Sequence, residues 1–432
     1  MKSSTISIGN TSPGHNWIRV FLGVAFQIAV CDSLISFGGA VGSDNSLGRQ
    51  LLWGSIGASS LIYIITSQLS VRAPQFSFGG WPIWLLLIHA AASTTWSITP
   101  EVTLKRSILL LFLVTACGAT VGSMPADKHQ ESFSKFFAPP MVFLVTISLI
   151  LTAIAPNYTF TAIGWRGVSG TKNETGQMMA FSVLLILYGV YSAKLKKLAH
   201  ALLLIAAIAL LFQTRSTAAL LGIIFAVTIV GVIATVSLMR RSQRWAVIVT
   251  TALLVTGATL FAAFQLQALP AFSEVYTDLL AKMGKSDNFT GRTSIWNIVL
   301  GESRYHDPLI GGGYGGFWAG RQSISGYALI GNNIYPGQAH NGYLDIYNDL
   351  GIIGLILLSA TLIIAFYRNY QLAAMNHIEA KLHFSITLLC LFLNLGESTL
   401  LRTTQFMNIV FIASVIRTAA LTSAHRIYGT AK

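Results

Sequence analysis

The sequence predicts an all-α, polytopic membrane protein of about 12 transmembrane helices with one large extracytoplasmic loop. Two observations lead to this fold class. Hydrophobic residues make up 53% of the 432-residue chain and charged residues only 10%, with a mean hydropathy of +0.63, whereas a soluble domain is ~25% charged. The apolar residues also gather in runs long enough to cross ~30 Å of hydrocarbon, which needs ~20 residues of helix.

Twelve apolar runs meet this description, and the runs at 81–98 and 198–213 are the weakest of them. The runs lie at residues 17–37, 51–70, 81–98, 104–122, 137–155, 175–193, 198–213, 216–238, 245–267, 342–367, 380–397 and 405–424. They divide the chain into transmembrane helices 1–9 within residues 1–267, an extracytoplasmic loop with short helices at 268–341, and transmembrane helices 10–12 with a cytoplasmic tail at 342–432.

The distribution of Lys and Arg predicts that both termini are cytoplasmic. With the N-terminus inside, sixteen of the 28 Lys and Arg residues fall in cytoplasmic segments and seven in the short outer loops. Short loops rich in Lys and Arg face the cytoplasm. The 268–341 loop therefore faces outward, where Trp296, Phe317 and Trp318 are expected to anchor its short helices at the membrane surface.

The net charge of +13 does not indicate a nucleic-acid-binding protein. The basic residues lie in short turns between apolar runs, where they orient the chain and meet anionic lipid headgroups. Cys31, Cys117 and Cys390 lie inside apolar runs, far apart and without CxxC spacing. They are expected to be small core residues and not a disulfide framework or a metal site, and no cofactor is predicted.

Four polar clusters fall on the outer side in this topology, at residues 170–175, 213–217, 291–296 and 340–341. Such convergence on one face of the bilayer is what an extracytoplasmic active site requires. Arg215 is the sharpest candidate, because it lies on the outer side with no carboxylate near it in sequence. A lipid-linked phosphate or pyrophosphate would suit its guanidinium, and the alternative is a snorkelling or topology-setting residue. Arg292 and Lys172 have the alternative role of solvated surface charges, with Glu174 as a simple partner for Lys172.

His340 is the candidate general base, because an imidazole titrates near neutrality and can take a proton from a sugar hydroxyl. Its alternative role is to cap the following helix or simply to lie at the membrane interface. Asp345 and Asp349 share one helix face near it and are candidates to orient the imidazole or to bind sugar hydroxyls, with a helix-surface role as the alternative. The glycine run at 311–316 contains GxGxxG but follows no strand of a βαβ unit, so we interpret it as a tight turn or flexible hinge and not as a nucleotide site.

Together these residues resemble the O-antigen ligase and Wzy-type polymerase superfamily, whose members share the motif H-[NSQ]-x9-G-x-x-[GTY]. His340, Asn341, Gly351 and Gly354 match every fixed position of this motif. The stretch 291–318 resembles the family pattern GRxxxW…PxxGxGxxxF through Gly291, Arg292, Trp296, Pro308, Gly311, Gly313 and Phe317. TRSTAALLG resembles the "SR" element through Arg215, and GTKNETGQ the "KN" element through Lys172 and Asn173. The family often has serine before the "SR" arginine, where this chain has Thr214.

The resemblance implies a GT-C-like glycosyltransferase of the bacterial inner membrane that uses an undecaprenyl-pyrophosphate-linked glycan on the periplasmic face. It implies that Arg215 and Arg292 hold the pyrophosphate and that His340 acts on the acceptor hydroxyl, without a metal ion. We expect Lys172, Asn173, Trp296, Asn341 and Asp345 to bind substrate. Besides the lipid-linked donor and acceptor and the bilayer, a flippase and a chain-length co-polymerase become candidate partners.

Two outcomes within the family remain open. A ligase passes the glycan to lipid A core, whereas a polymerase passes the growing chain to another lipid-linked repeat unit. The wording of the outer loop and of AHNGYLD looks most like exopolysaccharide polymerases of the succinoglycan type and favours a polymerase. A transporter is the hypothesis from another class, but the spans hold few acidic residues beyond Asp32 and Glu397 and show no matching halves.

Overall fold

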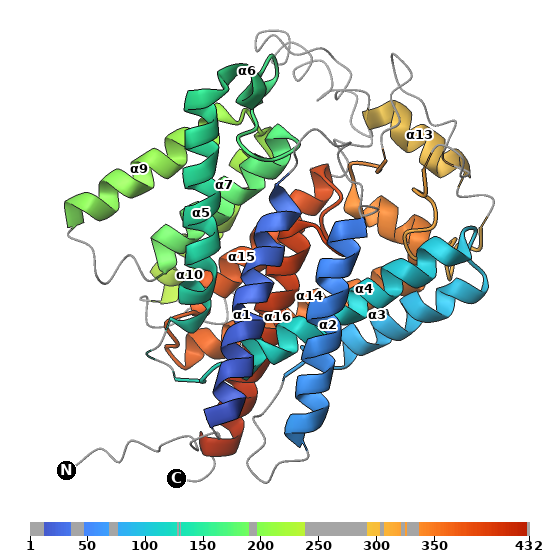
Figure 1. Ribbon diagram of the computed structural model, residues 1–432, viewed down its shortest axis with the longest axis horizontal. Coiled ribbons are helices and arrows are strands. Elements are labelled where there is room, and N and C mark those ends of the chain that lie inside the picture. Colours follow the sequence, from blue (N-terminus) through green and yellow to red (C-terminus); the bar gives the residue numbers. More distant parts are fainter. Residues whose placement is uncertain are drawn as a thin grey trace.

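The computed structural model describes residues 13–35, 47–68, 77–127, 129, 131–189, 197–237, 292–302, 306–320, 325 and 337–429, mostly as helices (Figure 1). The helices are α1 (Pro13–Leu34), α2 (Leu47–Gln68), α3 (Trp81–Ala92), α4 (Pro100–Ala119), α5 (Ser132–Ile154), α6 (Pro156–Thr159), α7 (Lys172–Tyr188), α9 (Lys197–Gln213), α10 (Thr217–Ser237), α13 (Arg292–Glu302), α14 (Gly342–Ala374), α15 (Ala380–Gly396) and α16 (Phe406–Gly429). Two 3-10 turns, η1 (Ser93–Thr95) and η2 (Val121–Ser123), follow α3 and α4. Strands β1 (Phe160–Thr161) and β2 (Gly164–Trp165) form an antiparallel hairpin.

Six helices among the described residues are long and apolar enough to cross a membrane, as expected of a multi-pass membrane protein. They are Trp17–Leu34, Pro100–Ser123, Ser132–Ile154, Thr217–Ala234, Gly342–Ala374 and Phe406–His425. Two shorter apolar helices, Leu198–Gln213 and Ala380–Gly396, coincide with two further predicted spans. The runs predicted at 51–70 and 175–193 are helical as α2 and α7. The run at 245–267 lies outside the described residues, so the count of twelve stays a prediction.

The run predicted at 81–98 forms a much shorter helix than expected. α3 contains twelve residues and then tightens into η1 at Ser93. Twelve residues rise only ~18 Å, less than the ~30 Å of a hydrocarbon core. The hydroxyls of Ser93 and Thr95 bond back to Ala90 and Ala92 carbonyls of the preceding turn, which offers the backbone an alternative to a continued α-helix. The apolar composition of residues 81–98 therefore predicted a longer helix than the one that forms.

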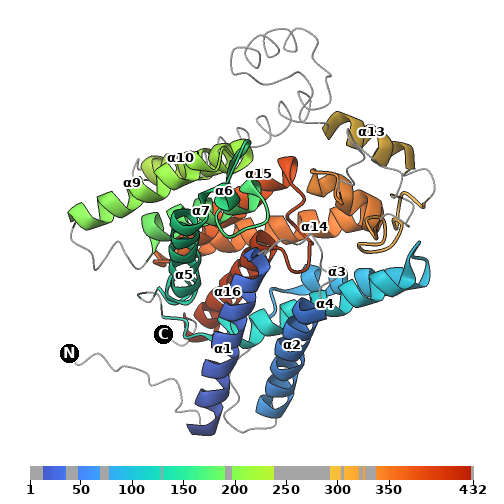
Figure 2. The same ribbon diagram turned by 45° about the horizontal axis from the view of Figure 1, so that its top comes forward.

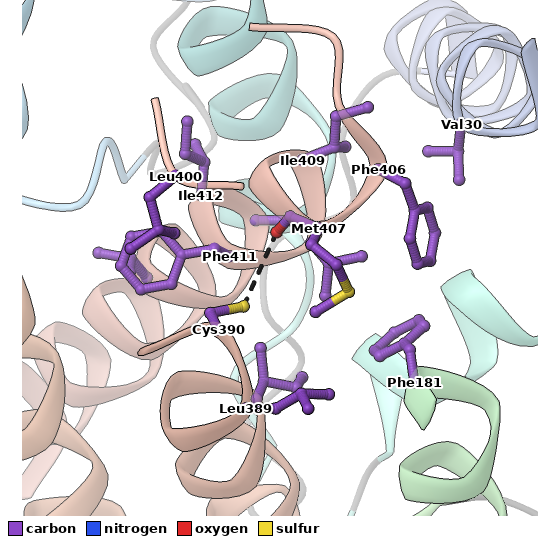
Figure 3. Close-up of a cluster of buried hydrophobic side chains, with 14 of the residues drawn as sticks. Val30, Phe181, Leu389, Cys390, Leu400, Phe406, Met407, Ile409, Phe411 and Ile412 are labelled. Atoms are coloured by element: carbon purple, nitrogen blue, oxygen red, sulfur yellow. Dashed lines mark hydrogen bonds between the residues drawn. The ribbon is translucent and has the colours of Figure 1, made fainter. Parts of the chain in front are cut away.

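One large apolar core joins the helices into a bundle. α2 packs on α4, α10 on α15, and α14 on both α3 and α15. Figure 3 shows part of this core, where Phe406 and Met407 of α16 lie against Leu389 and Cys390 of α15 and near Phe181 of α7. Cys390 and Cys117 are fully buried and all three cysteines are free, which fits the predicted role of small core residues.

A buried ionic cluster joins α16 to the starts of α5 and α15. Glu379 accepts hydrogen bonds from Arg417 Nε (3.1 Å) and from the Phe133 amide (2.6 Å). Burial acts to raise the pKa of Glu379, but the hydrogen bond from His383 and the positive charge of Arg417 outweigh it and lower this pKa to about 2. The carboxylate therefore stays charged and holds three elements together.

A second, smaller core lies between α13, the residues at 317–318 and the start of α14, and it differs from the expectation of membrane-surface anchors. Trp296, Phe317 and Trp318 are only 7%, 1% and 5% exposed. They pack together with Ile295, Val299 and Ala339, and Figure 2 shows α13 beside the beginning of α14. The three aromatic side chains are therefore buried in an apolar cluster that α13 forms with the start of α14.

Candidate active site

The helix that follows His340 is interrupted at the first glycine of the histidine motif. Gly351 has φ +65° and ψ −162°, so α14 consists of a nine-residue half-helix and a long second half. A Cβ at this position would lie 2.3 Å from the Leu309 carbonyl oxygen. Only glycine fits this conformation and this contact. Gly354, one turn later, leaves room for the Leu350 side chain, whose Cβ would be 2.3 Å from an added Cβ.

The glycine run at 311–316 closes this interruption by supplying the missing hydrogen bonds. The amides of Gly312 and Gly313 donate to the Asn348 and Asp349 carbonyls at 2.9 Å each. The Ile352 and Ile353 amides of the second half donate to the Pro308 and Leu309 carbonyls at 2.9 and 3.0 Å. Broken helices at membrane depth require such partners, because an unpaired backbone group there costs several kcal/mol. The run is therefore a rigid clasp on α14 and not a flexible hinge.

Replacing Gly351 with alanine is expected to destabilise the fold through this clasp. The added Cβ meets backbone atoms that cannot move aside, and the backbone strain alone costs about 1–3 kcal/mol. Gly54→Ala in α2 is the matched control, because nothing lies within 4 Å of its added Cβ. The buried thiols of Cys117 and Cys390 react with a thiol dye only on unfolding, so the temperature of labelling measures the effect. Equal labelling temperatures for the two variants would contradict the clasp.

The first half of α14 is fixed against the end of α15. The Asn341 side chain accepts from the Tyr343 and Leu344 amides (3.1 and 3.3 Å) and so caps the helix. The Tyr343 hydroxyl donates to the Leu391 carbonyl at 3.0 Å. A Cβ on Gly342 would overlap the Asn394 side chain. Asn341 therefore performs the capping role that was the alternative for His340.

His340 lies two residues before this half-helix, and its imidazole is held through Nδ1 alone among the described residues. Its φ of +51° is in the left-handed region, which few non-glycine residues adopt. Nδ1 lies 3.0 Å from Glu397 Oε2 and 3.2 Å from the Gln338 side-chain amide. Nε2 makes no hydrogen bond with any residue that the structure describes, and the side chain is 28% exposed. A carboxylate only accepts hydrogen bonds, so its pairing with Nδ1 places the proton there and leaves the Nε2 lone pair available.

Glu397 connects the histidine to the "KN" element. It follows the last residue of α15, and its side chain is 5% exposed. Its Oε1 accepts a hydrogen bond from Asn173 Nδ2 at 2.7 Å while Oε2 faces His340. Asn173 is the second residue of α7, whose start is fixed by a capping box between Thr171 and Glu174. Glu174 therefore partners Thr171 in this cap. His340 and Asn173, more than 160 positions apart in the sequence, both bond to the carboxylate of Glu397.

Arg215 lies beside the start of α7. Lys172 Nζ donates to the Ile163 carbonyl (3.2 Å) and to the Arg215 carbonyl (3.4 Å). The Arg215 backbone has φ +51° in the tight turn between α9 and α10, and its side chain is exposed. Within the described part of the chain its guanidinium has no hydrogen-bond or ion-pair partner. An exposed, strained and unpaired arginine is what a site for a charged ligand requires.

Helix starts add to the positive character of this cluster. Lys172, Thr217 and Gly342 begin α7, α10 and α14, and each helix start carries a partial positive charge. α7 and α10 meet closely there, because a Cβ on Gly176 would lie 2.5 Å from Ser216 Cβ. The cluster therefore combines a base, two cations and three helix starts, which suits an anionic substrate.

Two of the predicted substrate-binding residues lie behind the histidine. Trp296 Nε1 donates to the Ala339 carbonyl at 2.8 Å, directly before His340. Asp345 is 5% exposed and accepts from Trp318 Nε1 (2.7 Å), the Ala339 amide (3.1 Å) and Ser398. Both side chains are thus engaged with the protein and shape the segment that carries His340. Arg292 begins α13, but its side chain lies outside the described residues.

The segment after α15 contains the residues that sequence reasoning missed. Glu397 pairs with His340, Ser398 donates to Asp345, and Arg402 Nη2 donates to the Gly337 carbonyl at 3.0 Å. Glu397 had a detectable signal, since an acidic residue at the end of an apolar span is a functional candidate by default. The sequence, however, indicated Glu397 only as one of two acidic residues within the apolar spans. Within the described residues, no group of three or more His, Cys, Asp and Glu side chains could hold a metal ion.

Comparison with known proteins identifies the same region. The family described as O-antigen ligase matches residues 201–359, which include Arg215, α13, the glycine clasp and the histidine motif. The chain is also 24% identical over 301 residues to "Exopolysaccharide production protein ExoQ" of Rhizobium meliloti (strain 1021). That match covers 66% of this chain and 64% of the relative, slightly less than two thirds of its length. These findings confirm the resemblance of the chain to the O-antigen ligase and Wzy-type polymerase superfamily, and to its ExoQ-like members.

Proposed function

We propose that the protein is a membrane glycosyltransferase that polymerises undecaprenyl-pyrophosphate-linked oligosaccharide repeat units into exopolysaccharide on the periplasmic face of the inner membrane. One observation carries this proposal: His340 pairs with Glu397, Glu397 accepts from Asn173, and the neighbouring Lys172 donates to the backbone carbonyl of Arg215, whose guanidinium is unpaired among the described residues. A base beside an anion-binding arginine is the pair of groups that glycosyl transfer from a diphosphate needs.

The proposed step is an inverting displacement without a metal ion. Nε2 of His340 takes the proton of an acceptor sugar hydroxyl, and the hydroxyl oxygen forms a bond to the anomeric carbon of the donor. The bond from that carbon to the pyrophosphate oxygen breaks, and the electron pair leaves with undecaprenyl pyrophosphate. Arg215, Lys172 and Arg292 would stabilise the negative charge that develops on this leaving group. The proton on His340 then passes to solvent.

Several residues take supporting roles in this proposal. Glu397 and Asn173 would fix the tautomer and orientation of the imidazole. Trp296 and Asp345, predicted as substrate ligands, are better suited to positioning the 337–340 segment, because their polar atoms already bond to it. Asn341 would act through its cap on α14. The printed name of the relative, an exopolysaccharide production protein, supports a polymer product.

A ligase is the second candidate, and the description of the matching family favours it. A cellular experiment separates the candidates. A strain whose only copy carries His340→Ala should accumulate single lipid-linked repeat units if the protein is a polymerase. Normal polymer left unattached to lipid A would identify a ligase. Export of full-length polysaccharide by this strain would exclude the polymerase, and loss of lipid-linked repeats from the outer leaflet would indicate a transporter.

Glu397→Gln is expected to lower kcat/KM about 10- to 100-fold, because a hydrogen bond to a charged group contributes about 1.5–3 kcal/mol. The loss should lie in kcat and not in KM, because Glu397 orients the imidazole and is not proposed to touch the substrate. Asp32→Asn is the matched control, because this second acidic residue of the apolar spans pairs with Arg49 instead. A merely structural Glu397 would lower the amount of folded protein and leave the kcat of the remainder unchanged.

A further inference from the structure

A groove of about 380 Å³ lies between α1, the end of α4 and the start of α5, within the size range of ligand sites. Its lining is apolar except for one charged side chain and two polar ones. The lining residues are Arg19, Val20, Gly23, Val24, Gln27, Ala119, Thr120, Met124 and Phe136. Gly23 forms part of the floor, where a Cβ would contact Phe136 at an ordinary distance of 3.6 Å, so a larger side chain can be introduced there.

The groove lies at the other end of α4 from the glycine clasp. α4 begins beside the glycine clasp, where the Ile98 amide donates to the Gly312 carbonyl (3.0 Å) and the Thr99 hydroxyl to the Gly316 carbonyl (2.9 Å). Its twenty residues rise ~30 Å, the thickness of a hydrocarbon core. Ala119 and Thr120, at the far end of α4, line the groove. Figure 1 follows α4 between these two ends.

The α1 side of the groove faces the lipid. On α1, Trp17 is 76% exposed, Val20 58% and Val24 50%. Exposed apolar side chains on a membrane-crossing helix contact hydrocarbon, and a tryptophan at a helix end lies at headgroup level. A molecule that enters the groove from this side is therefore a lipid, with its chain along Val20, Val24 and Phe136.

Arg19 stands at the headgroup level of this groove. Its Nη2 donates to the Ser123 carbonyl at 2.8 Å, which ties it to the end of η2. Among the described residues, the remaining guanidinium nitrogens have no hydrogen-bond partner, and no carboxylate forms a salt bridge with this side chain. A guanidinium fixed through one nitrogen still presents the others to a phosphate. The groove thus offers one phosphate site above one apolar channel.

We propose that this groove binds an anionic phospholipid, with its phosphate on Arg19 and an acyl chain between α1 and α5. The site is independent of the proposed catalytic step, because it lies at the end of α4 far from the glycine clasp and shares no residue with the candidate active site. A basic residue near an anionic membrane surface contributes about fivefold in affinity. Phosphatidylglycerol should therefore be retained over phosphatidylcholine by about this factor.

Native mass spectrometry of the full-length protein, released from nanodiscs with equal amounts of phosphatidylglycerol and phosphatidylcholine, tests the proposal. Arg19→Ala should retain about fivefold less phosphatidylglycerol, relative to phosphatidylcholine, than the unaltered protein does, whereas Arg19→Lys should keep most of the preference. Gly23→Leu, which fills the groove, should lower retention of both lipids. Arg49→Ala, on a basic residue paired with Asp32, should match the unaltered protein. An unchanged preference in Arg19→Ala, or unchanged retention in Gly23→Leu, would overturn the proposal.

Discussion

His340→Ala should extend lipid-linked glycan about 10²–10⁴-fold more slowly than the unaltered protein, the usual contribution of a positioned general base. The imidazole is the proposed base for the acceptor hydroxyl, and its Nδ1 is already engaged by Glu397. Alanine removes Nε2 while the Asn341 cap and the glycine clasp stay in place. The variant should therefore fold, bind substrate and fail at the chemical step.

The measurement is the rate of product formation from a defined lipid-pyrophosphate oligosaccharide, with the loss expected in kcat and not in KM. His129→Ala serves as the matched control, because this histidine is exposed in the loop before α5. Labelling of the buried Cys117 and Cys390 thiols verifies that both variants are folded. A His340→Ala rate within a few-fold of the control would rule out the base assignment.

Arg215→Ala should lower the rate about 10²–10³-fold, the loss typical of removing one group that stabilises developing negative charge. The side chain is exposed and unpaired among the described residues, so its removal breaks no contact that the structure records. Its turn is held by backbone hydrogen bonds, such as the one from the Arg215 amide to the Phe212 carbonyl at 3.0 Å. The loss should therefore lie in catalysis and not in folding.

Two further variants sharpen this result. Arg215→Lys keeps the charge but loses the bidentate fork, so its rate should fall between those of the alanine variant and the unaltered protein. Arg166→Ala is the control, because this arginine is already engaged by Tyr158 through its ring at 4.2 Å and through its carbonyl at 2.7 Å. If the Arg166 and Arg215 alanine variants lose activity equally, the specific role of Arg215 is wrong.

Much of the fold could be predicted from the sequence, because apolar runs are local signals. The runs predicted at 104–122, 137–155 and 216–238 coincide with α4, α5 and α10. α3 shows the limit of such signals. Its apolar composition continues past the helix, while hydroxyl groups that bond to the preceding turn end it at Ala92.

Only part of the candidate site could be predicted from the sequence. His340 and Arg215 could be found, because each is a polar residue at the edge of an apolar run. The pairing of Glu397 with both His340 and Asn173 could not, since it joins three segments that only the tertiary fold brings together. The link between the two glycine motifs also depends on the tertiary fold. Gly351 breaks α14, and residues 308–313 supply the hydrogen bonds that the break removes. Their dependence on each other is invisible to either motif alone.

The central claim is that this protein transfers glycan from an undecaprenyl-pyrophosphate donor by means of His340 and Arg215. The most direct test incubates the purified protein with one defined undecaprenyl-pyrophosphate oligosaccharide, with a metal chelator present. The account predicts lipid-linked products that grow by whole repeat units, one undecaprenyl pyrophosphate released for each unit added, and inverted configuration at the new linkage. Release of undecaprenyl pyrophosphate without chain growth, or growth that the His340→Ala and Arg215→Ala variants sustain at the full rate, would contradict it.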